Sequence, residues 1–79
     1  MNLEVCLYAS LAAHLPDRAD GNSCVMEVED GSTVEALLTR LNVPLHAAKI
    51  IFLNGTHAQL GTSLKEGDRL AVFPPIAGG

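Results

Sequence analysis

The residue types best suited to chemistry lie in the last segment of the sequence, which runs from Phe73 to Gly79 and has no charged side chain. Pro74 and Pro75 favour a stiff, extended backbone and cannot donate hydrogen bonds to a sheet, so this tail should project away from the folded part. Gly78 and Gly79 have no side chains. A carboxylate on Gly79 would therefore fit a narrow channel, and the catalytic groups of another protein could approach it closely. We predict that this carboxylate is the reactive group.

A carboxylate is a poor acylating agent until it is activated. Attack on the α-phosphate of a nucleotide would convert it to an acyl adenylate, from which a sulfur nucleophile can displace the nucleotide. The rest of the chain offers no recognisable group for this step, because its histidines and cysteines follow no catalytic or metal-binding spacing. These residues are His14, His46, His57, Cys6 and Cys24. We expect no catalytic residue and no metal site inside the domain, and chemistry supplied by partner proteins.

Length and composition indicate one small folded domain. The chain has 79 residues, of which 48% are hydrophobic and 18% charged, enough for one core and too few for two. We expect a domain over residues 1–73 and a flexible, extended tail over residues 74–79. Two cysteines cannot form a disulfide framework, which fits a reducing cytoplasm.

Charge and hydropathy argue against two classes of partner. The formal net charge of −4 is opposite to what phosphate binding needs, so we expect no nucleic-acid partner. No apolar run approaches the length of a bilayer span, and the first residues do not resemble a secretion signal. We therefore expect no membrane partner and no export.

The periodicity of apolar residues predicts the elements that must position the tail. Alternation predicts strands at residues 3–8 and 24–29, and a short helical turn is expected at residues 10–15. A β-branched and aromatic run predicts a central strand at 50–53, with a tight turn at 54–55. A short strand at 57–60 and a last strand at 70–73 complete the set.

A helix is expected over residues 33–42, because apolar residues recur there at helical spacing. Ser32 and Glu35 resemble a capping box at its start, and Pro44 prevents its continuation. This order of elements lets one helix bury its leucine stripe on one face of a single sheet. It predicts an α+β fold of the ubiquitin-like β-grasp class, with a mixed sheet of four to five strands packed on one main helix.

Strand parity predicts which side chains face away from that helix. Cys24 is expected in the core, and Cys6 is expected on the outer face, as an exposed thiol. An exposed apolar patch on a small domain usually marks a partner surface. We expect such a partner-docking patch to contain Tyr8, Ile50, Phe52 and Phe73.

The tail also carries a family resemblance. Its Phe-Pro-Pro-aliphatic-Ala-Gly-Gly ending, preceded by residues 64–69, resembles the ending of the sulfur carriers that include the molybdopterin synthase small subunit and the thiamine-pathway carrier. Weaker similarity extends through residues 7–11, 31–34 and 54–55. The ending is most similar to the molybdopterin branch, whereas residues 50–57 resemble a broader set of ubiquitin-like carriers.

The resemblance implies a small carrier that is not itself an enzyme. An E1-like adenylating enzyme would use ATP to activate Gly79, and sulfur from a persulfide donor would replace AMP to leave a thiocarboxylate. The implied acceptor is a synthase such as the molybdopterin synthase large subunit, which the tail would enter. The resemblance makes Gly79 the carrier residue. The residues that fit the channel would be Pro74, Pro75, Ile76, Ala77 and Gly78.

Several alternatives stay open at this point. The carrier could supply sulfur for thiamine, tRNA thiolation, cysteine or a tungsten cofactor. It could instead be a protein modifier, in which activated Gly79 joins a lysine through an isopeptide bond. A third alternative is an interaction module whose two final glycines are incidental; it predicts that removal of Gly79 has no effect.

Overall fold

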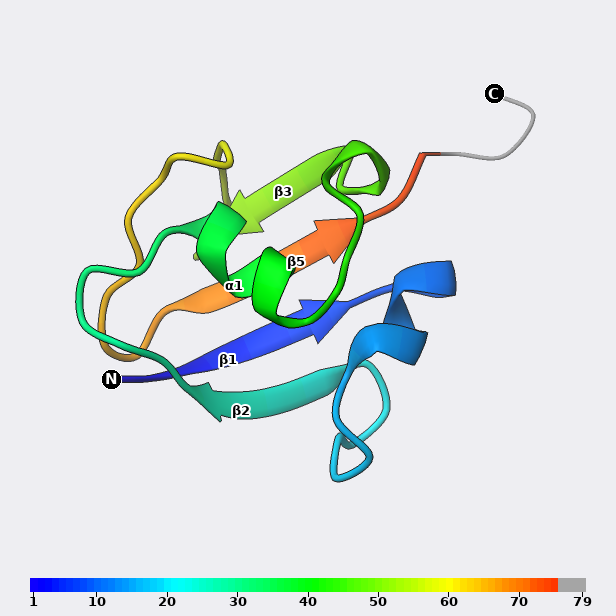
Figure 1. Ribbon diagram of the computed structural model, residues 1–79, viewed down its shortest axis with the longest axis horizontal. Coiled ribbons are helices and arrows are strands. Elements are labelled where there is room, and N and C mark those ends of the chain that lie inside the picture. Colours follow the sequence, from blue (N-terminus) through cyan, green and yellow to red (C-terminus); the bar gives the residue numbers. More distant parts are fainter. Residues whose placement is uncertain (76–79) are drawn as a thin grey trace.

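The alternating segments and apolar runs form one sheet, which the computed structural model describes for residues 1–75 (Figure 1). Its strand order is β2-β1-β5-β3-β4, with β5 parallel to β1 and the other neighbours antiparallel. The expected mixed sheet on one main helix is therefore confirmed, with five strands. In chain order the elements are β1 (Asn2–Leu7), η1 (Ala9–His14), β2 (Ser23–Glu27), α1 (Val34–Arg40), η2 (Leu45–Ala47), β3 (Ile50–Leu53), β4 (Thr56–His57) and β5 (Arg69–Phe73).

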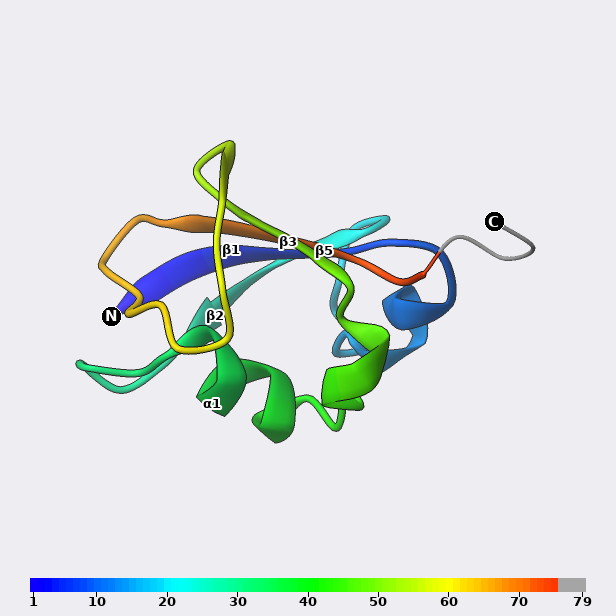
Figure 2. The same cartoon turned by 90° about the horizontal axis from the view of Figure 1, so that it is seen from above.

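The core lies between one face of the sheet and the helices. Figure 2 shows α1 and the short 3-10 helices η1 and η2 on the same side of the sheet. Leu7 of β1 and Leu38 of α1 are both fully buried between these layers. A fully buried side chain of this size contributes roughly 1.5–3 kcal/mol to stability. These helices leave the opposite face of the sheet uncovered, and the candidate site lies on that face.

The start of α1 differs from the expected capping box. Thr33 is the N-cap, and its hydroxyl accepts a hydrogen bond of 3.2 Å from the backbone N–H of Ala36. The Ser32 hydroxyl instead donates to the carbonyl of Glu29 at 2.7 Å, closing the preceding turn. The expectation of a Ser32 cap was therefore wrong by one residue, and the helix is shorter than the predicted 33–42.

The strand after the β3 turn is also shorter than expected. Asn54 and Gly55 both have positive φ and form the predicted tight turn, but β4 ends at His57 rather than at residue 60. The chain then leaves the sheet to reach the first turn of α1, where Glu35 N–H donates to the carbonyl of Leu60 at 2.9 Å. This bond gives a partner to an N–H group at the start of α1 that would otherwise be unpaired, and a longer β4 would leave it without one.

A buried carboxylate fastens the β3–β4 turn to the start of β5. Asp68 is 8% exposed. Its Oδ1 accepts from the side-chain amide of Asn54 at 2.8 Å, and its Oδ2 accepts from the backbone N–H of Lys65 at 2.7 Å. The Asn54 side chain also accepts from the N–H of Arg69 at 2.9 Å. The sequence did not reveal this network, because Asn54 is brought to Asp68 and Arg69 only by the pairing of β3 with β5.

Within residues 1–75, no helix combines the length and the apolar character needed to cross a membrane.

Candidate functional site

The uncovered face of the sheet presents side chains in rows, because residues paired in neighbouring strands lie side by side. Three such rows pass through β5 on this face, at Arg69, Ala71 and Phe73. The rows contain Glu4 and Arg69; Cys6, Ala71, Phe52 and His57; and Phe73 with Ile50. The apolar row lies at the end of β5 from which the tail leaves the sheet (Figure 1).

The four residues expected in a docking patch lie together at that end. The rings of Tyr8 and Phe73 are stacked, with centroids 4.5 Å apart and planes 5° apart. Phe52 meets Phe73 edge to face at 6.2 Å, and Ile50 is the direct strand partner of Phe73. All four side chains are half-buried. We call Tyr8, Ile50, Phe52 and Phe73 the open-face patch; its role in docking stays a prediction.

The root of the tail is held on both sides. The backbone N–H of Tyr8 donates to the carbonyl of Val72 at 3.2 Å, and the N–H of Lys49 donates to the carbonyl of Phe73 at 3.1 Å. Pro74 is half-buried and Pro75 is exposed, and neither has an N–H with which to extend the ladder. The position and direction of the chain are therefore determined up to Phe73. The predicted channel and carrier residues Ile76, Ala77, Gly78 and Gly79 lie outside the described residues.

A polar network borders the patch, and its centre is Glu4. The Ser23 hydroxyl donates to Glu4 Oε2 at 2.6 Å, and Arg69 Nε lies 3.3 Å from Glu4 Oε1. The hydrogen bond from Ser23, with help from the charge of Arg69, lowers the pKa of the Glu4 carboxyl below its ordinary value of 4.5, against an opposing effect of desolvation. Glu4 is therefore ionised near neutral pH. Strand parity placed Glu4 on this face, but only the register of β1 with β2 and β5 brings these partners to it.

Cys6 faces the uncovered side as expected, yet the expectation that its thiol is exposed was wrong. Cys6 is 1% exposed, because β1 has a neighbouring strand on each side, with Ser23 and Ala71 as its direct partners. Its Sγ lies 3.8 Å from Glu4 Oε2 in a weak hydrogen bond. Cys24 is buried in the core, as predicted, and both thiols are free.

His57 packs edge to face against Phe52, with ring centroids 4.7 Å apart, so it borders the open-face patch. Residues 1–75 contain no group of three or more histidine, cysteine or acidic side chains placed to hold a metal ion.

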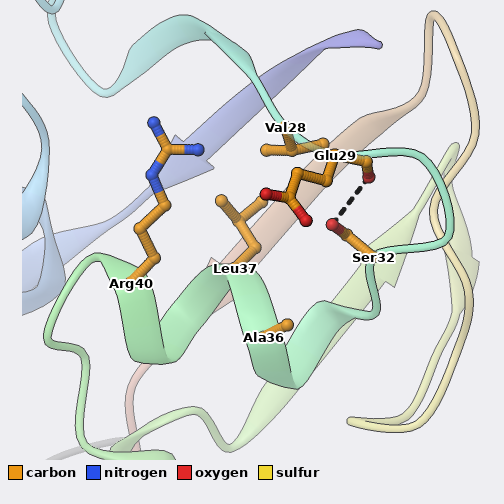
Figure 3. Close-up of a pocket in the computed structure, with 6 residues that line it drawn as sticks. All are labelled: Val28, Glu29, Ser32, Ala36, Leu37 and Arg40. Atoms are coloured by element: carbon orange, nitrogen blue, oxygen red, sulfur yellow. Dashed lines mark hydrogen bonds between the residues drawn. The ribbon is translucent and has the colours of Figure 1, made fainter.

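A hollow among the described residues lies away from this face, between α1 and the segment that follows β2. It has a volume of about 400 Å³ and is lined by Val28, Glu29, Ser32, Ala36, Leu37 and Arg40. Figure 3 shows the Arg40 side chain extending from the end of α1 along one side of this hollow. The hollow contains none of the residues that the sequence singled out for chemistry.

The chain is similar to one known protein family. The model of the ThiS family matches residues 11–79, which is most of the chain and includes the tail. A search of curated proteins gives no match.

Solved structures share the fold over nearly the whole chain. Small archaeal modifier protein 1 of Haloferax volcanii is 27% identical, with a TM-score of 0.73, and the match covers 95% of this chain and 98% of that one. A putative molybdopterin converting factor subunit 1 of Pyrococcus furiosus is 20% identical, with a TM-score of 0.67 and coverage of 95% and 98%. One chain from a complex of subunits 1 and 2 of the molybdopterin-converting factor of Helicobacter pylori is 21% identical, with a TM-score of 0.58, and the match covers 100% of this chain and 100% of that one. These likenesses confirm the ubiquitin-like β-grasp fold.

Proposed function

Because the chain belongs to the ThiS family, we propose that it is a sulfur carrier that receives sulfur as a thiocarboxylate on Gly79. The observation that carries this proposal is the extent of the family match, which runs through residue 79 and so includes both final glycines. The described structure supports it by holding the chain firmly up to Phe73, beyond which two prolines interrupt any further pairing.

In this proposal the chain contributes the carboxylate and its presentation, and partner proteins contribute the reactive groups. An E1-like enzyme uses ATP to adenylate Gly79 and releases pyrophosphate. The outer sulfur of a persulfide donor then attacks the carbonyl and displaces AMP, and a thiol cleaves the resulting acyl disulfide, which leaves the thiocarboxylate on Gly79 and a disulfide on the donor side. The thiocarboxylate is delivered to an acceptor synthase. Pro74, Pro75, Ile76, Ala77 and Gly78 fit the channel of each partner in turn, and the carrier works in the cytoplasm, where its two free thiols stay reduced.

The open-face patch is the surface we propose for docking both partners. Aromatic residues are favoured at the centres of interfaces because they bury a large area with little loss of conformational entropy. Phe73 belongs both to the patch and to the root of the tail, so a partner that covers Phe52 and Tyr8 also determines where the tail begins. The Glu4–Arg69 pair would lie at the polar rim of that interface.

For the acceptor, we propose the large subunit of a molybdopterin synthase. The support is the Phe-Pro-Pro-aliphatic-Ala-Gly-Gly ending, which is most similar to that branch of the carriers. Supply of sulfur for thiamine, tRNA thiolation, cysteine or a tungsten cofactor uses the same carrier chemistry and differs only in the acceptor.

A second candidate is a protein modifier, and one observation favours it. The match at 27% identity is to a protein that is named as a small archaeal modifier. A modifier would also be adenylated on Gly79, but an amine of another protein would then attack the activated carbonyl and form an isopeptide bond. The two functions share the first step and separate at the acceptor.

Adenylation of Gly79 is tested by the exchange of labelled pyrophosphate into ATP by a cognate E1-like enzyme. We expect exchange that depends on the carrier, that is lost when Gly79 is deleted, and that persists in a Lys65→Ala variant, since Lys65 is remote from the patch. Equal exchange with the Gly79-deleted chain would contradict the proposal and favour an interaction module with an incidental ending.

A further inference from the structure

The outer edge of β2 is the longer of the two free edges of the sheet. The edge at the other side is β4, which has only two residues, Thr56 and His57. Strands this short offer little for another strand to pair with, whereas β2 has five residues. A free edge of that length is a template for pairing with another chain unless something blocks it.

The ladder between β1 and β2 determines which backbone groups of β2 face outward. Leu7 N–H donates to the carbonyl of Asn22, and Val28 N–H donates to the carbonyl of Met1. In an antiparallel pair the direction of the backbone N–H and C=O groups alternates from one residue to the next. The backbone groups of the even-numbered residues of β2 therefore point toward β1. The N–H and C=O groups of Ser23, Val25 and Glu27 therefore point away from the sheet.

Each of the three outward carbonyls already accepts a hydrogen bond. Ser23 exchanges both of its backbone bonds with Asp20, at 2.8 and 3.1 Å. Arg18 Nη1 donates to the carbonyl of Val25 at 2.8 Å, and Arg40 Nη1 donates to the carbonyl of Glu27 at 2.7 Å.

The two arginines come from different parts of the fold. Arg18 lies in the loop between η1 and β2, and Arg40 is the last residue of α1. Figure 3 shows the Arg40 side chain running from α1 toward β2 beside the hollow. The Arg40 guanidinium therefore bounds the hollow on the side of the edge strand β2. The two arginines thus donate hydrogen bonds to the carbonyls of Val25 and Glu27, which are consecutive outward-facing carbonyls of the same strand edge.

We propose that Arg18 and Arg40 block the β2 edge against antiparallel pairing with β2 of a second copy of this chain. A second copy is the occupant that fits, because pairing centred on Met26 places Val25 of each copy opposite Glu27 of the other. Such pairing would use the outward N–H and C=O groups of both residues in both copies. Val25 is also the most exposed large apolar side chain of the described residues, at 59%, and pairing would shelter it.

The arginines make this pairing unfavourable through an exchange of hydrogen bonds. Four backbone bonds could form across the two copies, but four arginine bonds to the same carbonyls would be lost. Hydrogen bonds from a charged donor are roughly twice as strong as neutral ones, so the exchange favours the separate chains. A separate chain keeps its open-face patch and tail available, although the blocking of this edge does not depend on what those parts do.

The test compares self-association of the unaltered chain with that of an Arg18→Ala/Arg40→Ala variant, by sedimentation over a range of concentrations. We expect the unaltered chain to stay monomeric and the variant to associate into dimers, with an association constant raised roughly tenfold or more. A Lys49→Ala/Lys65→Ala variant also removes two positive charges, but from other sites, and should stay monomeric. If the double arginine variant loses its fold by circular dichroism, the two single variants replace it.

A third substitution locates the association. Val25→Pro removes an outward N–H without touching the ladder to β1, so in the double arginine background it should restore the monomer. The proposal is overturned if the folded arginine variants stay monomeric, if the lysine control associates equally, or if association survives Val25→Pro.

Discussion

Tyr8 and Phe73 stack face to face, with ring centroids 4.5 Å apart, although one follows the first strand and the other ends the last. The stack joins the end of β1 to the root of the tail. Because β1 and β5 are parallel neighbours, both rings lie at the same end of the sheet. A partner that binds the open-face patch therefore binds a surface whose position relative to the first tail residue is determined by the fold.

The patch is tested by Phe52→Asp. We expect binding to the E1-like enzyme or the acceptor synthase to weaken at least tenfold, or about 1.4 kcal/mol, because a charge would have to be desolvated at the centre of the interface. Titration calorimetry measures the affinity, and circular dichroism checks the fold. Thr39→Asp is the control, since Thr39 is exposed on α1, on the other side of the sheet from the patch, and the affinity of this variant should be unchanged. Unfolding of the Phe52 variant would instead place Phe52 in the core and refute the docking assignment.

The core is tested at Leu38, which is fully buried between α1 and the sheet. Leu38→Asp should unfold the domain, since it buries an unpaired carboxylate, and Leu38→Ala should lower the free energy of unfolding by about 2–5 kcal/mol. Denaturant titration followed by circular dichroism gives both results. Thr39→Asp places the same charge on the exposed side of α1 and should change stability by only about 0.5 kcal/mol. A folded Leu38→Asp variant would show that α1 does not pack as described.

The polar network predicts a dependence on pH. The pKa of Glu4 is lowered, mainly by the Ser23 hydroxyl, so the network stabilises the fold above the ordinary carboxyl value of 4.5 and loses this effect as pH falls through the lowered pKa. Ser23→Ala should raise the Glu4 pKa toward 4.5, as followed by NMR titration of the side-chain carboxyl. Ser63→Ala is a matched control, since Ser63 is an exposed serine outside this network. An unchanged Glu4 pKa in the Ser23 variant would mean that Arg69 or Cys6 causes the shift.

Removal of the buried Asp68 carboxylate should lower the stability of the fold without weakening the docking of partners. Asp68→Ala leaves the Asn54 amide and the Lys65 N–H without their acceptor, and we expect the free energy of unfolding to fall by about 1–3 kcal/mol. Glu66→Ala, in the same turn but exposed, should cost less. Thermal melts of the three proteins measure the difference. Equal melting temperatures for the Asp68 variant and the unaltered chain would contradict the assigned role of this network.

Local patterns in the sequence account for most of the fold. The helical spacing of Val34, Leu38 and Leu41 and the alternation in β1 are local patterns, so the elements and their buried faces could be predicted. The boundaries were less predictable, because the N-cap depends on whether Ser32 or Thr33 faces the helix start, and the preceding turn occupies Ser32.

The candidate site was predictable only in part, because register is not a local property. Parity placed Tyr8 and Phe73 on one face, but only the parallel pairing of β1 with β5 makes them stack. The same pairing buries Cys6, which alternation alone predicted to be exposed, and brings Arg69 to Glu4. The edge arginines gave no sequence signal, since Arg18 and Arg40 reach β2 from separate elements.

Loading of sulfur on Gly79 is measured most directly by the intact mass of the chain after incubation with ATP, a cognate E1-like enzyme, a persulfide source and a thiol reductant. We expect a mass gain equal to the replacement of one oxygen by sulfur, mapped by fragmentation to Gly79 and absent when Gly79 is deleted. An unchanged mass, with an enzyme that loads another carrier in the same experiment, would contradict the proposal that Gly79 carries sulfur.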